Sequence, residues 1–182
     1  HHWRQLELDG AFAYLHKTDP VAGGGYFVMC DVEDRDNVED SLSAAGIVPA
    51  GEEAFEYLRI EEGLPRLGRE ISEDYIPLEA GLWADVSFAK GCYIGQEIIA
   101  RMESRGRLAK QLAQLHPAAP LEAGMEIEAG SRSAGTVTSA ADGPQGPVAL
   151  GYVKTRALDD EDEVTLTAGD VPLQPVPVSP RP

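Results

Sequence analysis

The sequence contains little positive charge and no long apolar run. Of its 182 residues, 31 are acidic and 15 are basic, which leaves a formal net charge of −16, and only four of the basic residues are lysines. Binding to nucleic acid through phosphates requires a basic surface, so the charge argues against a direct nucleic-acid partner. No stretch is apolar enough for a membrane span, which predicts a soluble globular chain of one large domain or two small ones.

Cysteine is scarce as well. Cys30 and Cys92 lack the paired spacing with cysteine or histidine that a metal site requires, so we predict no metal site. Reduced thiols in a cytoplasmic compartment are the expectation. No signal peptide is recognisable, and His1 and His2 are set aside as tag-like residues. The sequence also lacks a His-Ser-Asp set, a phosphate-binding loop and a dinucleotide fingerprint.

Hydrophobic patterning predicts an α+β region in the first part of the chain. Short alternating or apolar runs indicate strands, and residues spaced at three and four positions indicate helices. Residues 65–82 are rich in glycine and proline and are expected to be irregular. The predicted strands are 3–8, 10–16 and 26–30, and the predicted helices are 34–45, 52–63 and 95–105.

Beyond residue 107 the pattern changes to short strand-like runs separated by turn residues, which is typical of a small antiparallel β-barrel. The predicted fold class is α+β: a ferredoxin-like unit with two helices, then a helix, then a C-terminal antiparallel β-barrel. We expect domains at 3–106 and 107–176 and a tail at 177–182. The predicted barrel strands are 108–115, 125–129, 135–139, 148–153, 164–167 and 171–176.

Cys92 is the first candidate for chemistry. It stands two residues after Lys90 and just ahead of the helix expected from Gly95. Backbone N–H groups at a helix start and a nearby ammonium both favour a thiolate, which is the reactive form of cysteine. The alternative is a small buried side chain, which is the commoner role of a free cysteine.

Glu61 is the second candidate. On a helical wheel it falls within an apolar face formed by Ala54, Phe55, Tyr57 and Leu58, whereas Glu53, Glu56 and Arg59 point elsewhere. A carboxylate on a buried face needs hydrogen-bond donors, such as the N–H groups of a pterin's amino-pyrimidine edge. The alternative is a partly exposed side chain at a frayed helix end, or one that caps nearby backbone N–H groups.

The helix after Cys92 carries further polar candidates. Gln96 and Glu97 stand in its first turn, where such side chains commonly cap the helix. Glu97 and Arg101 are four residues apart, in the orientation that favours an ion pair. Arg101, Arg105 and Arg107 gather positive charge that could hold an anionic ligand group, although such residues more often form solvated ion pairs.

Several segments resemble one known family. KGCYIGQE at 90–97 resembles the K-x-C-[FY]-x-G-Q-E motif of the YgfZ family of folate-binding proteins, which are relatives of the glycine-cleavage T-protein, an aminomethyltransferase. LRIEEG at 58–63 and IPLEAGL at 76–82 are similar to segments of the wider superfamily. GTVTS at 135–139 and ALGYV at 149–153 resemble runs in the C-terminal barrel of the family.

The resemblance implies a tetrahydrofolate-binding fold and a role in iron–sulfur cluster assembly or repair, and through cluster enzymes in tRNA modification. It implies folate and iron–sulfur proteins or assembly factors as partners. Glu61 matches the carboxylate that faces the pterin, with Gln96, Glu97 and Arg101 as further cofactor-binding candidates. Cys92 and Lys90 match the residues that separate YgfZ-type proteins from aminomethyltransferases.

Members of this family carry a further N-terminal portion that completes the folate site, including an aspartate that serves aminomethyl transfer. We therefore expect this chain to correspond to the C-terminal portion, with an incomplete site for tetrahydrofolate or a one-carbon derivative. One alternative is a tetrahydrofolate-dependent aminomethyltransferase. Another is a non-enzymatic interaction module that docks through acidic residues such as Glu161 and Asp162.

Overall fold

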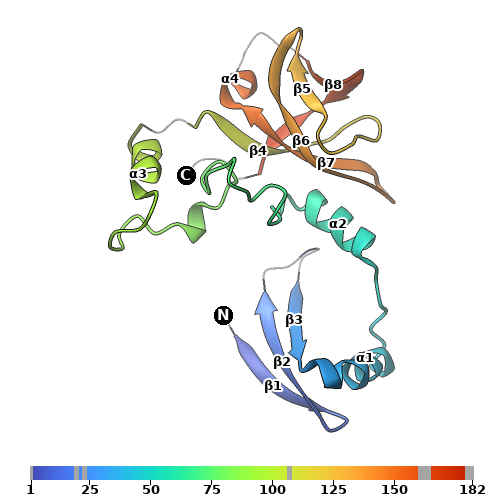
Figure 1. Cartoon of the computed structure of the whole chain (residues 1–182). Coiled ribbons are helices and arrows are strands. Elements are labelled where there is room, and N and C mark those ends of the chain that lie inside the picture. The colour runs from blue at the N-terminus through green and yellow to red at the C-terminus, as the bar shows by residue number, and fades with distance from the viewer. Residues whose placement is uncertain (1, 19–20, 22–23, 106–107, 160–164, 179–182) are drawn as a thin grey trace. The chain divides into compact units, whose positions relative to one another are not determined.

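The computed structural model describes residues 2–18, 21, 24–105, 108–159 and 165–178 (Figure 1). Its strands are β1 (Trp3–Leu8), β2 (Ala11–Thr18), β3 (Gly25–Cys30), β4 (Lys110–Leu115), β5 (Glu126–Ala129), β6 (Arg132–Gly143), β7 (Gly146–Lys154), β8 (Leu166–Ala168), β9 (Val171–Leu173) and β10 (Pro175–Pro177). Its helices are α1 (Arg35–Ala44), α2 (Glu52–Glu61), α3 (Gln96–Arg105) and α4 (Thr155–Leu158), with 3-10 turns η2 (Val32–Asp34) and η3 (Trp83–Asp85).

The chain divides into two compact units, residues 1–58 and 59–182. The domain boundary that the sequence predicts at 106/107 falls on residues outside the described ranges and stays a prediction. Glu161, Asp162 and Arg107, named above as candidates for docking or anion binding, also lie outside those ranges.

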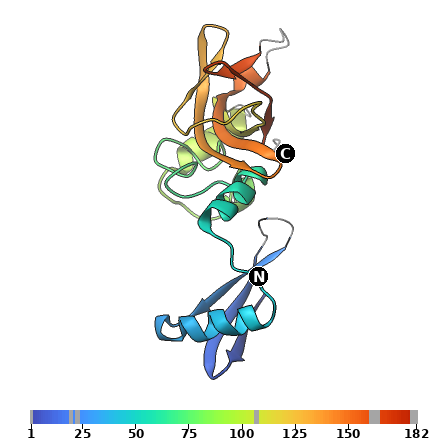
Figure 2. The same cartoon turned by 90° about the vertical axis from the view of Figure 1, so that its right-hand side faces the viewer.

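The first unit is a three-stranded antiparallel sheet in the order β1-β2-β3, with α1 on one face (Figure 2). Asp9 and Gly10 connect β1 to β2, and both have positive φ angles, which is the turn that Asp-Gly favours between paired strands. The buried face is small: Ala11 and Ala13 pack against Val38 of α1, with the half-buried Cys30 beside them. Cys30 is thus a packing residue, as its apolar strand predicts.

The opposite face of this sheet is apolar and exposed. Its five large side chains come from all three strands and are between 45% and 68% exposed. They are Trp3, Phe12, Tyr14, Phe27 and Met29. The α+β character of this part is confirmed, whereas the ferredoxin-like topology stays a prediction.

The second unit contains a seven-stranded sheet in the order β10-β4-β7-β6-β5-β8-β9, which curves into a nearly closed barrel (Figures 1 and 2). Every neighbouring pair is antiparallel, so the predicted antiparallel barrel is confirmed. Alternate residues of each strand fill its interior. The main cluster consists of Ala113, Leu115, Ile127, Ala134, Val137, Ala149, Val153, Leu166, Ala168 and Leu173.

The β6–β7 hairpin is longer than the sequence predicts. The predicted strands 135–139 and 148–153 leave residues 140–147 between them, but the ladder continues to the pair Gly143↔Gly146. Only Pro144 and Gln145 remain as the loop. A two-residue connection of this kind lets both strands pair along their full length.

Residues 62–95, between α2 and α3, contain little regular structure, in agreement with the irregular segment predicted at 65–82. This segment packs against the barrel through main-chain and side-chain contacts. The N–H of Leu112 in β4 donates to the carbonyl of Glu79 at 2.8 Å, and Leu78 packs with Ile99 of α3 and Leu108. The segment therefore fixes α3 to the start of the first barrel strand.

The buried face of α2 differs from the helical-wheel prediction. Tyr57, Arg59 and Ile60 are buried, whereas Ala54 and Phe55 are exposed. Arg59, which was predicted to point away from the core, is 2% exposed. A helical wheel assigns an arginine to the solvent-exposed face, but here the Arg59 side chain forms an ion pair with a buried carboxylate, described below.

Candidate functional site

The segment 90–97 forms the approach to α3. The N–H of Gln96 donates to the carbonyl of Tyr93 at 3.3 Å, which closes a turn directly before the helix. Gly95 in this turn has a φ of +87°, a conformation that residues with a Cβ atom rarely adopt. The glycine of the motif is thus required by the backbone that begins α3.

Cys92 is exposed and forms no disulfide. The alternative of a small buried cysteine is therefore wrong, because the thiol lies on the surface four residues ahead of the first residue of α3. Lys90 is exposed too, and its Nζ lies 5.1 Å from the centre of the Tyr93 ring. This cation–π contact keeps the ammonium close to the turn that carries the thiol.

The polar candidates of α3 lie on its accessible side. Gln96 is half-buried, and Glu97 and Arg101 are exposed one turn apart. Ile99 packs into the core, whereas its neighbour Ile98 is 52% exposed. The side chain of Arg105 lies outside the described part of the structure.

Glu61 is the last residue of α2 and is half-buried. Its main-chain carbonyl accepts a hydrogen bond from the side-chain amide of Gln114, which belongs to β4. Gly63 follows with a φ of +73°, which ends the helix. The end of α2 is thus held against the barrel, and the role of the Glu61 side chain stays a prediction.

A buried polar network beside Glu61 was not found from the sequence. Arg59 Nη1 donates to Glu70 Oε2 at 3.1 Å, and Arg59 Nη2 donates to Ser139 Oγ at 2.7 Å. The Ser139 hydroxyl in turn donates to Glu70 Oε1 at 2.6 Å. All three side chains are at most 2% exposed as residues, so α2, the irregular segment and β6 are joined in the interior.

The backbone completes this network. The N–H of Arg66 donates to Glu70 Oε2 at 3.0 Å, and Arg59 Nη1 also donates to the carbonyl of Leu64 at 3.2 Å. The Tyr152 hydroxyl donates to the carbonyl of Glu70 at 2.8 Å. Both charged side chains have several hydrogen-bond partners, which is the condition under which a buried ion pair is tolerated. The only sequence signal was the Arg59 of the LRIEEG segment.

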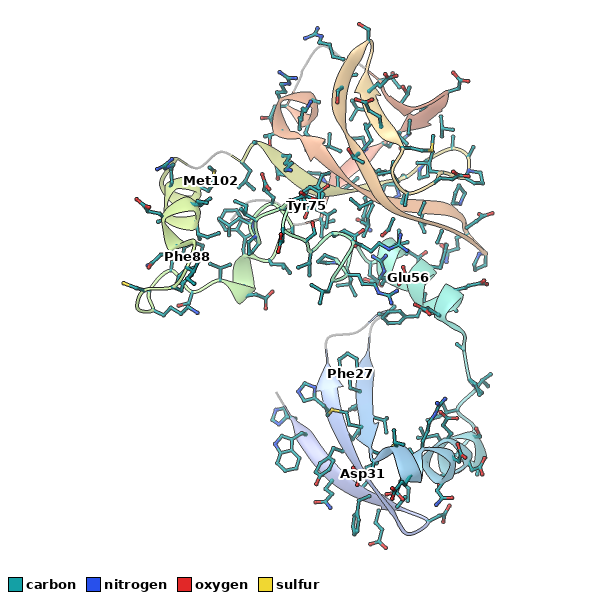
Figure 3. All side chains as sticks on the ribbon, in the orientation of Figure 1. Phe27, Asp31, Glu56, Tyr75, Phe88 and Met102 are labelled. Atoms are coloured by element: carbon teal, nitrogen blue, oxygen red, sulfur yellow. The ribbon has the colours of Figure 1, made fainter. Side chains whose placement is uncertain are left out.

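A second missed feature is an aromatic stack capped by a cation. The ring centres of Tyr75, which Figure 3 labels, and Tyr152 are 3.5 Å apart and the rings are nearly parallel. Lys110 Nζ lies 4.2 Å from the centre of the Tyr75 ring. Burial raises the pKa of Tyr152 well above its usual value, so its hydroxyl stays protonated as a donor. Burial also raises the pKa of the nearby Glu79 carboxyl, which accepts from the N–H of Ile76.

The predicted site residues therefore lie on two elements. Glu61 is anchored through Gln114 to β4, and the Cys92 turn is anchored through Ile99 of α3 to Leu108, just before β4. The described residues hold no group of three or more His, Cys, Asp or Glu side chains arranged for a metal ion. Nor does any helix in the described ranges have the length and hydropathy of a membrane crossing.

Two family profiles match this chain. The GCVT N-terminal domain matches residues 1–90, and the C-terminal beta-barrel domain of CAF17 matches residues 108–180. The second match coincides with the barrel that begins at β4.

Individual relatives agree with the profiles. A chloroplastic Arabidopsis thaliana protein named as a transferase, At1g60990, is 36% identical over 148 residues, which are 80% of this chain and 34% of that protein. The aminomethyltransferase of Rubrobacter xylanophilus is 30% identical over 179 residues, which are 96% of this chain and 48% of that enzyme. The chain thus spans a third to a half of the length of these relatives.

A solved structure has the same fold. Aminomethyltransferase T of the glycine cleavage system from Bartonella henselae superimposes with a TM-score of 0.73 at 23% sequence identity. The superposition covers 90% of this chain and 48% of that one.

Proposed function

We propose, from the premise that the chain belongs to the aminomethyltransferase (T-protein) superfamily and to its YgfZ-type branch, that it binds tetrahydrofolate and acts in iron–sulfur cluster assembly or repair. The observation that carries the proposal is the exposed Cys92, presented by a turn in front of α3 within the segment 90–97. A surface thiol on a fixed turn is accessible to a protein partner, and thiolate is the usual protein ligand of iron–sulfur clusters.

The residues at the end of α2 fit one part of a folate. Its aminopyrimidine edge offers adjacent N–H donors, and Glu61 supplies a half-buried carboxylate on a helix end that Gln114 holds in place. Two such hydrogen bonds to a carboxylate are charge-assisted and directional. In the proposal, Gln96, Glu97 and Arg101 contribute further contacts, and the folate supplies one-carbon or redox chemistry when bound.

Cys92 and Lys90 are the proposed chemical pair. The thiol contacts the cluster or a partner's sulfur, and the Lys90 ammonium beside Tyr93 stabilises negative charge there. The clients are iron–sulfur proteins or assembly factors, including those on which tRNA modification depends, in a cytoplasmic, reducing compartment. These roles are proposed for the whole protein, because this chain spans less than half of the length of these relatives.

The test is a comparison of two neighbouring carboxylates. Binding of tetrahydrofolate is measured by isothermal titration calorimetry on the intact protein carrying either Glu61→Gln or Glu62→Gln. Glu62 follows Glu61 directly and is exposed, so it is a matched control. We expect Glu61→Gln to weaken binding at least about tenfold, the loss of one charge-assisted hydrogen bond, with Glu62→Gln unchanged. Equal affinities for both variants would remove Glu61 from the site.

The second candidate function is tetrahydrofolate-dependent aminomethyl transfer, and the similarity to aminomethyltransferases over 96% of the chain favours it. The two candidates differ in what Cys92 does. Cys92→Ser abolishes complementation of a strain that lacks the family protein if the thiol serves clusters. The same variant retains full aminomethyl transfer if the chain belongs to the enzyme class.

A further inference from the structure

A groove of about 810 Å³ lies between α3 and the barrel, at the end where β4 begins and β7 ends. Figure 3 labels Met102, which lines it from α3. The described residues that line the groove are Met102, Leu108, Ala109, Lys110, Lys154, Thr155 and Arg156. None of them is among the predicted site residues.

Positive charge is concentrated here beyond what the fold requires. Lys110 and Lys154 are direct partners across the β4–β7 ladder, and Arg156 follows two residues later. Like charges directly opposite one another destabilise a pair of strands. They are two of the four lysines in a chain with a net charge of −16, so half of a scarce residue type lies at this groove.

Neutral acceptors orient the two lysines. Lys110 Nζ donates to the carbonyl of Asp74 at 3.1 Å, and Lys154 Nζ donates to the carbonyl of Ser133 at 2.8 Å. Among the described residues, no carboxylate lies within ion-pair distance of these lysines or of Arg156. Burial raises the pKa of the Glu79 carboxyl, and the Lys110 charge offsets part of this rise. The carboxyl group itself accepts a hydrogen bond from the N–H of Ile76.

The remaining wall of the groove is apolar. Leu108 is 8% exposed and Met102 is half-buried, so together with Ala109 they form a fixed apolar surface beside the cations. A site with an apolar wall and a few convergent charges is typical of small-molecule binding. The arrangement fits a ligand whose anionic group meets the cations while its body covers the apolar wall.

We propose that this groove binds a small organic anion, with its carboxylate or phosphate group between Lys154 and Arg156 and its apolar body against Met102 and Leu108. An anion in this position would meet two cationic side chains that have no carboxylate partner among the described residues. The proposal does not depend on folate binding at Glu61, because it names a different set of residues.

Two probes separate the sources of the anion. 4-Aminobenzoyl-glutamate carries carboxylates on an aromatic body, phenyl phosphate carries a phosphate on one, and benzamide is the uncharged control. Binding to the intact chain is measured by calorimetry at low and at physiological salt. We expect one of the anionic probes to bind more tightly than benzamide, and its affinity to fall as salt rises.

The site is assigned by substitution. We expect the double variant Lys154→Gln, Arg156→Gln to weaken binding of the anionic probe at least about tenfold, which is the loss of one to two charge-assisted hydrogen bonds. Lys17→Gln, an exposed lysine of the first unit, is the matched control and should bind unchanged. If the double variant does not fold, the same binding measurement is made on Arg156→Gln alone. The Arg156 side chain is exposed, so this substitution should not affect folding. Failure of both anions to bind, or equal affinity in wild type and variant, overturns the proposal.

Discussion

Arg59 and Glu70 form an ion pair in the interior of the second unit, with 3.1 Å between Nη1 and Oε2 and side-chain exposures of 3% and 0%. Ser139 of β6 bonds to both members, so the pair joins the end of α2 to the barrel. Glu61 stands two residues after Arg59. The position of the proposed folate carboxylate therefore depends on a buried electrostatic contact as well as on apolar packing.

Removing one partner of this pair should be strongly destabilising. Glu70→Gln removes the buried carboxylate that pairs with the Arg59 guanidinium, and we expect the free energy of unfolding to fall by about 3–5 kcal/mol. Urea unfolding followed by near-UV circular dichroism measures the change. The control is Glu39→Gln, which breaks the exposed Arg35–Glu39 pair and should leave stability unchanged. Similar losses in both variants would mean that the buried pair has no special role.

The barrel could be predicted because its signals are local. Alternating apolar residues and turn-forming residues recur at short intervals after residue 107, and the pairs β5–β6, β6–β7 and β8–β9 join strands that are consecutive in the chain. The Arg59–Glu70 pair could not be predicted this way, since a charged residue in an irregular segment is ordinarily expected at the surface. The pairing of Lys110 with Lys154 depends on strand register, which periodicity does not reveal.

The candidate site could likewise be predicted only in part from the sequence. The motif at 90–97 indicated a cysteine before a helix, and α3 begins at Gln96 as expected. Periodicity could not decide that Cys92 is exposed, nor that Ile98 points out while Ile99 packs in. Those outcomes depend on which side of α3 meets Leu78 and Leu108, and these residues are distant in sequence.

Glu79 should make stability depend on pH. Burial raises its pKa above the ordinary 4.5, so the folded protein binds this proton more tightly than the unfolded chain. The stabilising effect is complete below the ordinary pKa and is lost as pH rises through the raised one. Glu79→Gln, which can still accept from Ile76, should flatten this decline. The urea midpoints of wild type and variant are measured across this pH range, and the change in their difference gives the contribution of Glu79. A difference that does not change with pH would contradict the expectation.

Gly151 should not tolerate a side chain. A Cβ atom there would lie 2.7 Å from the carbonyl oxygen of Thr136 and 2.8 Å from Leu115 Cδ1, inside the barrel. We expect Gly151→Ala to destabilise the protein by about 1–3 kcal/mol, as is typical of overpacked cores. Gly24→Ala is the control, because a Cβ atom at Gly24 meets nothing within 4 Å and its φ is not positive. Thermal unfolding by calorimetry compares the two, and an equal fall in melting temperature for Gly24→Ala would contradict the steric explanation.

Cys92 should react with thiol reagents far faster than Cys30. Its side chain is exposed on the turn before α3, whereas Cys30 is half-buried against Ala11, Ala13 and Val38. Labelling with a maleimide, followed by mass spectrometry, should show a fast and a slow phase, and Cys92→Ser should remove the fast one. Because this thiol lies on the surface, the same substitution should leave urea unfolding unchanged. A fast phase that persists in Cys92→Ser would show that Cys30 is the fast thiol, and a large loss of stability would show that Cys92 is packed and that the motif around it is structural.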